Sequence, residues 1–288
     1  GTLRDAVSYL LVELLADTSL WRPEQANEAF RLDLGALLAA EAETPALTDA
    51  AAHPLLKVAG VLGDLERWHA AAGRRGAQLE ARLERVRRLR ASFTEPEDRA
   101  RIRVHLENDL PAFRSVSWWA AGMALLADLV RGEDAPDALA EARRIADAGW
   151  KAYPDSFGGR QCRSIVETIE SPGFDLASMA LDAARRRSLQ VTHRNIATLH
   201  FRAWRRDIVR TIESARDYAL LGTHRDLDTI TSRPPDAEWS LSLPATPDFR
   251  SHVTYVTPPL DRPGLYTIAA SARPDFGSKH NRIVVTHL

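Results

Sequence analysis

The chain has 288 residues, with 38 basic against 39 acidic side chains and a formal net charge of −1 at pH 7. The length favours two domains over one, and the balanced charge argues against a nucleic-acid-binding protein, because such proteins usually carry a basic excess. The lone cysteine, Cys162, cannot form an internal disulfide, so packing must hold the fold together. No apolar run reaches the ~18 residues that a membrane-spanning helix needs.

Residues 1–185 are expected to form an α-helical array, because their apolar residues recur at the spacing of a helix. Thr2 is a candidate cap for a first helix that carries a stripe of Val7, Leu10, Leu11, Leu14 and Leu15. Pro23 suits the first turn of a second helix that extends through Leu38. Further helices are expected from Pro54, over residues 79–89, after a capping box of Thr94 and Glu97, over residues 118–130, from Pro136 and over residues 160–169, with breaks at Gly73 and Gly76 and a turn at Gly158 and Gly159.

Short helices with short links predict stacked antiparallel pairs, either as an α-solenoid or as an irregular bundle, and we prefer the solenoid. Residues 138–172 resemble a tetratricopeptide-type helix pair, although no repeat of ~34 residues recurs along the chain. The arginines at 85, 87, 88 and 90 alternate with apolar residues and lie close to Glu80 and Glu84. This pattern is typical of one solvated helix face, and a phosphate-binding stripe is the alternative.

Residues 186–288 are expected to form an antiparallel β-sandwich, because apolar residues there alternate with a period of two and Pro and Gly punctuate the runs. The expected strands cover residues 188–193, 197–204, 238–243, 253–255, 264–272 and 283–285, with a turn at Arg194 and Asn195. The positions expected in the sandwich core are Leu199, Phe201, Trp239, Leu241, Tyr255, Tyr266, Ile268 and Val285. No strand is expected before about residue 180, where the helical period still holds.

A helix over about residues 207–221 is expected to interrupt the sandwich, because Ile208, Ile212, Ala215 and Ala219 return to the helical period. Residues 175–187 lack the Gly/Ser-rich composition of a flexible tether. We therefore expect the two domains to dock and move as one body, with the face of Ile208 and Ile212 as a candidate bridge.

Two stretches of the second part resemble bacterial alpha-2-macroglobulins. Residues 263–272, Pro-Gly-Leu-Tyr-Thr-Ile-Ala-Ala-Ser-Ala, are similar to the PGxYxVxAS strand of that family, and residues 281–285 follow as its next strand. Residues 191–204 resemble the opening strands of the first macroglobulin-type domain, where a YRN turn leads into an RxYR strand. The resemblance is best over residues 188–288. It implies that the chain is the N-terminal helical region plus first macroglobulin-like domain of a longer protein.

The resemblance also implies a function: a non-catalytic part of a periplasmic or cell-surface protein that traps and inhibits proteases and protects the envelope. This part would serve as scaffold and as a protein-interaction surface, with neighbouring macroglobulin domains, proteases or envelope proteins as partners. Thioester members of the family carry a Cys-Gly-Glu-Gln segment. The sequence Gly-Arg-Gln-Cys-Arg-Ser around Cys162 does not match it, so no thioester is expected here.

The sequence predicts no catalytic, cofactor-binding or metal site, no cofactor and no nucleic-acid partner, because it holds no phosphate-binding loop, nucleophile motif or zinc motif. Four alternatives stay open. A zinc site could form from His193, His200, His252 and His287. Cys162, expected to be inert, could be a nucleophile. Trp118 and Trp119, expected in the core, could line the groove of a hydrolase. The chain could also be a free-standing peptide-binding helical module with a β-sandwich spacer.

Overall fold

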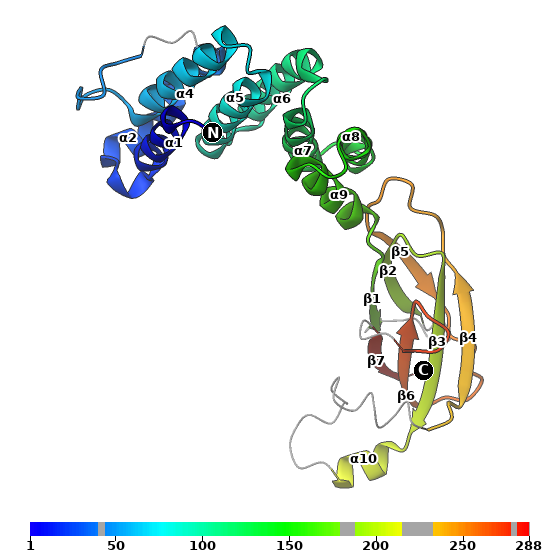
Figure 1. Ribbon diagram of the computed structural model, residues 1–288. Coiled ribbons are helices and arrows are strands. Elements are labelled where there is room, and N and C mark those ends of the chain that lie inside the picture. Colours follow the sequence, from blue (N-terminus) through cyan, green and yellow to red (C-terminus); the bar gives the residue numbers. More distant parts are fainter. Residues whose placement is uncertain (40–43, 179–187, 215–232, 278–280, 288) are drawn as a thin grey trace. The chain divides into compact units, whose positions relative to one another are not determined.

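The computed structural model describes residues 1–39, 44–178, 188–214, 233–277 and 281–287. It divides the chain into two compact units, Gly1–Ile169 and Glu170–Leu288, whose elements are labelled in Figure 1. In their described parts, the first unit is helical, and the second holds antiparallel strands and helix α10. The chain is therefore an α+β protein in which a helical region precedes a β region, as the change of apolar period predicts.

In the first unit, α4 packs on α5 and α7 on α8, which are neighbours in the chain, and α1 packs on α4. Their facing leucines, isoleucines and valines form the unit's core. The described elements are α1 (Leu3–Ala16), η1 (Thr18–Leu20), α2 (Pro23–Glu28), η2 (Ala29–Arg31), α3 (Leu34–Ala39), α4 (Pro54–Ala71), α5 (Arg75–Ser92), α6 (Pro96–Asp109), η3 (Leu110–Phe113), α7 (Trp118–Arg131), α8 (Ala138–Ala152) and α9 (Phe157–Glu170), where η marks a 3₁₀ turn.

Capping chemistry confirms one predicted helix start. The backbone N–H of Thr2 donates to Asp5 Oδ2 at 2.5 Å, and that of Asp5 donates to Thr2 Oγ1 at 3.3 Å, which completes a capping box at α1. The capping box predicted at Thr94 and Glu97 is wrong. Helix α6 begins instead at Pro96, whose fixed φ suits the first helical position and which has no N–H that needs a cap.

The second predicted helix, from Pro23 through Leu38, is not continuous. It is divided into α2, η2 and α3, because Asp33 starts a new helix. The side-chain oxygen Oδ1 of Asp33 accepts from the backbone N–H of Gly35 at 2.9 Å and of Ala36 at 3.3 Å. An aspartate that satisfies the free N–H groups of a helix start in this way favours a new helix over continuation of the old one.

The turn predicted at Gly158 and Gly159 is also wrong, because both lie in the first turn of α9. A Cβ atom on Gly158 would lie 2.1 Å from the backbone nitrogen of Ala121 in α7. Glycine is therefore present there because two helix backbones approach closely, and not because the chain bends. The predicted break at Gly73 is confirmed, since its φ of +68° ends α4 in the left-handed region, but Gly76 lies inside α5.

The second unit is a sandwich of two antiparallel sheets, in the order β1-β2-β5 and β4-β3-β6-β7. Asn195, with a φ of 54°, makes the turn that carries the chain from β2 in one sheet to β3 in the other. Strand β3 is the longest and pairs with both β4 and β6. The strands are β1 (Gly173–Ser178), β2 (Leu189–Arg194), β3 (Thr198–Arg206), β4 (Ala237–Ser242), β5 (His252–Val256), β6 (Leu265–Ser271) and β7 (Arg282–His287).

The sandwich core confirms most of the predicted positions. Leu199, Phe201, Tyr266 and Ile268 are buried in it, and Trp239 and Leu241 are half-buried and pack against it. The ring of Trp239 stacks on Phe201 with centroids 5.1 Å apart. The side chain of Val285 lies outside the described residues.

Tyr255 is the wrong member of the predicted core. It is exposed and lies opposite Gln190 of β2, on the outer face of its sheet, while the next residue, Val256, is buried. A shift of one residue moves every side chain of a strand to the other face. The five-residue strand β5 thus has the opposite phase to the one its apolar residues suggested.

Strand β1 overturns the expectation that no strand precedes residue 180. It pairs antiparallel with β2, with Leu176 opposite Val191, so the structure divides the chain at 169/170 where the sequence suggested 185/186. The predicted insertion is present as α10 (Ile208–Ser214) between β3 and β4, and the remainder of 207–221 lies outside the described residues. Ile212, expected to be buried, is exposed.

Candidate functional site

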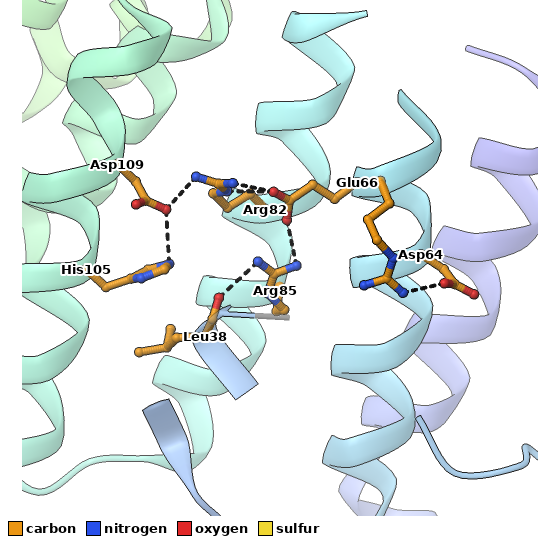
Figure 2. Close-up of polar contacts among 8 residues, drawn as sticks. Leu38, Asp64, Glu66, Arg82, Arg85, His105 and Asp109 are labelled. Atoms are coloured by element: carbon orange, nitrogen blue, oxygen red, sulfur yellow. Dashed lines mark hydrogen bonds and ion pairs between the residues drawn. The ribbon is translucent and has the colours of Figure 1, made fainter. Parts of the chain in front are cut away.

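Two buried charges of the helical unit, Glu66 and Arg85, belong to one cluster of polar side chains, which we call the Glu66 network (Figure 2). Glu66 of α4 accepts from Arg82 Nε at 2.8 Å and Nη2 at 2.5 Å, and its other carboxylate oxygen lies 2.7 Å from Arg85 Nη1. Arg82 also donates to Asp109 of α6 at 2.5 Å, and His105 Nε2 lies 3.4 Å from the same carboxylate oxygen. The Arg85 side chain, only 1% exposed, donates through Nη2 to the carbonyl oxygen of Leu38 at 3.0 Å.

The Glu66 network stabilises the packing of four helices rather than presenting a reactive group. Two carboxylates face two guanidinium groups, so their charges cancel when His105 is neutral. Burial, together with the positive charges of Arg82 and Arg85, lowers the pKa of His105, and Asp109 opposes this effect. Both carboxylates accept charge-assisted hydrogen bonds from Arg82. We therefore assign this cluster to the architecture of the unit.

The network also overturns the prediction that the arginines of α5 form one solvated face. Arg85 is fully buried, Arg88 Nε lies 2.6 Å from Glu84 Oε1, and Arg90 Nη2 lies 2.7 Å from Asp128 Oδ2. These pairs give the guanidinium groups carboxylate partners from within the unit. A free row of cations, which a phosphate-binding stripe requires, is not what the described part of α5 presents.

The two adjacent tryptophans do not line one groove. Trp119 is buried, as expected for the core, and borders a largely apolar pocket of about 290 Å³ with Met123, Leu126 and Ile145. Trp118 is half-buried and borders a different pocket, described below. Adjacent residues on a helix point about 100° apart, which separates the two rings.

Cys162 has the environment of a structural cysteine. It is fully buried, and its Sγ donates to the carbonyl oxygen of Ala120 at 3.3 Å. Burial raises the pKa of the Cys162 thiol to about 12. A nucleophilic cysteine needs a thiolate at neutral pH, and this site strongly disfavours one.

Two of the four histidines considered for zinc, His193 and His252, have other partners. His193 Nε2 lies 3.0 Å from Thr254 Oγ1, and His252 Nε2 lies 2.8 Å from Asp248 Oδ1. His193 and His252 are opposite one another across β2 and β5. Within the ranges that the structure describes, no three His, Cys, Asp or Glu side chains converge as metal ligands, and the side chain of His287 lies outside those ranges.

Helix α1 exposes a row of apolar side chains, which we call the α1 stripe and which consists of Leu3, Val7, Leu10 and Leu14. Their exposed fractions are 81%, 56%, 66% and 59%. Residues three and four apart share one helix face, and Val12, on the opposite face, is buried against Val58 and Leu62. The sequence predicted this helix but not which of its faces the fold would cover. Contiguous exposed apolar surface is typical of a site for a partner.

A second pocket, which we call the acidic hollow, adjoins the α1 stripe. It has a volume of about 200 Å³ and is lined by Tyr9, Glu13, Glu80, Glu84, Arg87, Arg88 and Trp118. The two arginines lie close to Glu84, with Arg87 Nη1 at 3.5 Å from its carboxylate. In the described part of the chain, Glu13 and Glu80 form no hydrogen bond or ion pair. Burial and the negative charge of Asp5 raise the pKa of Glu80, and the amino terminus and Arg87 oppose this effect. Three glutamates and two arginines line the hollow, so its side chains carry a net negative charge when ionised.

Comparison of the chain with models of known protein families, with curated proteins and with solved structures gave no match. The helices that the structure describes include none with both the length and the apolar character to cross a bilayer. The geometry of the chain itself must therefore support any proposal about its function. Two features of that geometry can do so, the α1 stripe with its acidic border and the pairing of the strands in the sandwich.

Proposed function

We propose that this chain is the N-terminal part of a bacterial alpha-2-macroglobulin-like protein, in which the helical unit binds a partner protein and the sandwich contributes to the frame of a protease trap. The proposal puts the protein in the periplasm or at the cell surface. It assigns no catalysis, cofactor or thioester to this part, and it makes neighbouring macroglobulin-type domains the partners of the sandwich.

The observation that carries the proposal is the pairing of β3 with β6. The two stretches that resemble the family lie far apart in the sequence, yet they form adjacent strands, with Ala203 opposite Ile268 and Phe201 opposite Ala270. Both strands contribute side chains to the same core. Two unrelated chance resemblances would have no reason to fall on neighbouring strands with matched inward faces.

A free-standing interaction module is the second candidate. The α1 stripe favours it as much as it favours the family proposal, because an exposed apolar helix face serves a partner in either setting. A hydrolase has less support, because Trp118 and Trp119 do not share the groove on which that alternative rested.

The native protein that contains this sequence provides the test. An antibody raised against the 32.0 kDa chain should detect a much larger protein in the periplasmic or surface fraction. Trypsin mixed with that purified protein should still cleave a small chromogenic peptide but lose its activity on casein, because a trapped protease is shielded from large substrates. A native protein of 32.0 kDa would favour the free-standing module. A large native protein that leaves casein cleavage unchanged would rule out the trap.

A further inference from the structure

We propose that the α1 stripe docks an amphipathic helix of another protein whose apolar face is bordered by lysine or arginine. The inference deepens the proposed role of the helical unit and rests on it, because it specifies the chemistry of the partner that this unit binds. It is carried by two independent features of one surface, the spacing of the exposed apolar residues and the glutamates beside them, of which Glu13 and Glu80 form no ion pair within the described part of the chain.

The spacing selects a helix as the occupant. Leu3, Val7, Leu10 and Leu14 are separated by four, three and four residues, which is the a/d spacing of a coiled-coil seam. Side chains at this spacing present knobs to a facing helix that packs at a shallow crossing angle. Helix α1 has 14 residues and is about 21 Å long, so a partner helix of four turns would cover the whole stripe.

The charge beside the stripe selects a basic border on that helix. Glu13 is exposed and neighbours Leu10 and Leu14 on the surface of α1, and behind it lies the acidic hollow with Glu80. A lysine or arginine beside the partner's apolar face would neutralise these carboxylates, and Tyr9 and Trp118 offer aromatic surface to its alkyl stem and cation.

A second copy of this chain fits the surface less well. In an antiparallel two-fold pair of α1 helices, the same flank of each helix lies side by side, so Glu13 and Glu80 share that flank with the carboxylates of the second copy instead of a basic border. In a parallel pair, the acidic flank faces the flank of Arg4. However, Glu13 and Arg4 are nine residues apart, which is about 13 Å along the helix, and Arg4 already lies 4.8 Å from the ring centroid of Trp68.

A lipid surface fits less well too. Helices that lie in a membrane interface place lysine and arginine beside their apolar face, where they meet anionic headgroups. The α1 stripe has carboxylates in that position, at Glu13 and in the acidic hollow. An anionic bilayer would be repelled by the same charges that attract a basic helix.

Two synthetic helical peptides test the proposal on the full chain. Both have 14 residues, the length of α1, and the same leucine face, with lysine flanks in one and glutamate flanks in the other. In fluorescence anisotropy titrations, the lysine-flanked peptide should bind at least about tenfold more tightly than the glutamate-flanked one. The difference should shrink as salt is added, because exposed charges are screened.

Three variants complete the experiment. Leu10→Asp should weaken binding of the lysine-flanked peptide by about tenfold or more. Val209→Asp, at a residue of α10 that is 61% exposed, should leave it unchanged. Glu13→Lys should reduce the preference for lysine flanks and improve binding of the glutamate-flanked peptide. Circular dichroism spectra of the variants should match that of the wild type, since all three side chains are exposed.

Several results would overturn the inference. Equal binding of the two peptides would remove the charge argument, and unchanged binding by Leu10→Asp would remove the stripe. A dimer in sedimentation velocity that Leu10→Asp abolishes would make a second copy the occupant. Binding to phosphatidylcholine vesicles that depends on Leu10 would make it a lipid surface. None of these results bears on the size of the native protein or on protease shielding, so the two proposals can fail separately.

Discussion

Substitution of Glu66 by glutamine should destabilise the helical unit strongly, because it leaves the buried charge of Arg85 without its carboxylate. Arg85 is 1% exposed, and its remaining partner is the carbonyl oxygen of Leu38. Removal of one member of a buried ion pair typically costs about 3–5 kcal/mol. At roughly 2–4 °C per kcal/mol for a domain of this size, the melting temperature of the unit should fall by about 6–20 °C. Urea denaturation of the full chain, followed by far-UV circular dichroism, measures the loss.

Two comparisons isolate the cause. Asp64→Asn removes an equally short ion pair on the same helix, to Arg67 at 2.5 Å, but those side chains are 61% and 57% exposed, so the cost should stay below about 1 kcal/mol. Glu66→Leu combined with Arg85→Met removes both buried charges and should recover most of the stability. If Glu66→Gln costs no more than Asp64→Asn, the network contributes nothing. If the double variant is no more stable than Glu66→Gln, packing and not charge explains the loss.

Three further predictions concern single positions. Phe201→Ala should lower the free energy of unfolding of the sandwich by about 3–5 kcal/mol. Tyr255→Ala should lower it by less than about 1 kcal/mol, because that ring is exposed. Equal losses of unfolding free energy in urea denaturation would mean that the register of β5 is wrong. Gly158→Ala should destabilise by about 1–3 kcal/mol or more through its clash with the backbone of α7, and Gly76→Ala, with its nearest atom at 3.6 Å, should be neutral or stabilising. Cys162 should resist iodoacetamide at neutral pH and react once urea unfolds the chain, and methylamine should add no mass to the protein. The folded pKa of Cys162, about 12, exceeds the unfolded value of about 8.5. The protonated thiol therefore contributes stability that is present below the unfolded value and is lost as the pH rises toward the folded one. Rapid alkylation of the folded chain would contradict the burial of Cys162.

The period of apolar residues predicted most of the elements, because long elements average over single exceptions. Strand β3 has nine residues, and its buried positions alternate from Thr198 to Ala203, so its phase followed from the sequence. Strand β5 has five residues, and two of its apolar side chains face outward. Its phase is set by pairing with β2, which joins residues as far apart in the sequence as Leu189 and Val256, and no local pattern reports such a contact.

The sequence holds a signal for strand β1, but the signal is short. Pro172 and Gly173 punctuate its start, and Phe174 and Leu176 alternate with polar residues. The alternation covers too few positions to be separated from a helical pattern, and Leu176 also fits the helical spacing of the residues after it.

The candidate sites were less accessible to sequence analysis than the fold. The α1 stripe was visible as a row of leucines, but a helix that is apolar on most of its circumference does not indicate which face the fold covers. The Glu66 network joins residues from α3, α4, α5 and α6, and charged residues in a sequence are normally assigned to the surface. Only the packing of the helices shows that Arg85 faces inward.

The place of β1 in its sheet has a consequence for any attempt to divide the protein. A fragment that starts at residue 186 lacks the strand that covers one edge of β2, so the backbone N–H and C=O groups of Leu189–Arg194 on that side would be left open. Such an edge is a template for strands from other molecules. The fragment would associate with itself or accept an added peptide of the sequence of β1, whereas a fragment that starts at Glu170 would keep β2 paired with its own β1.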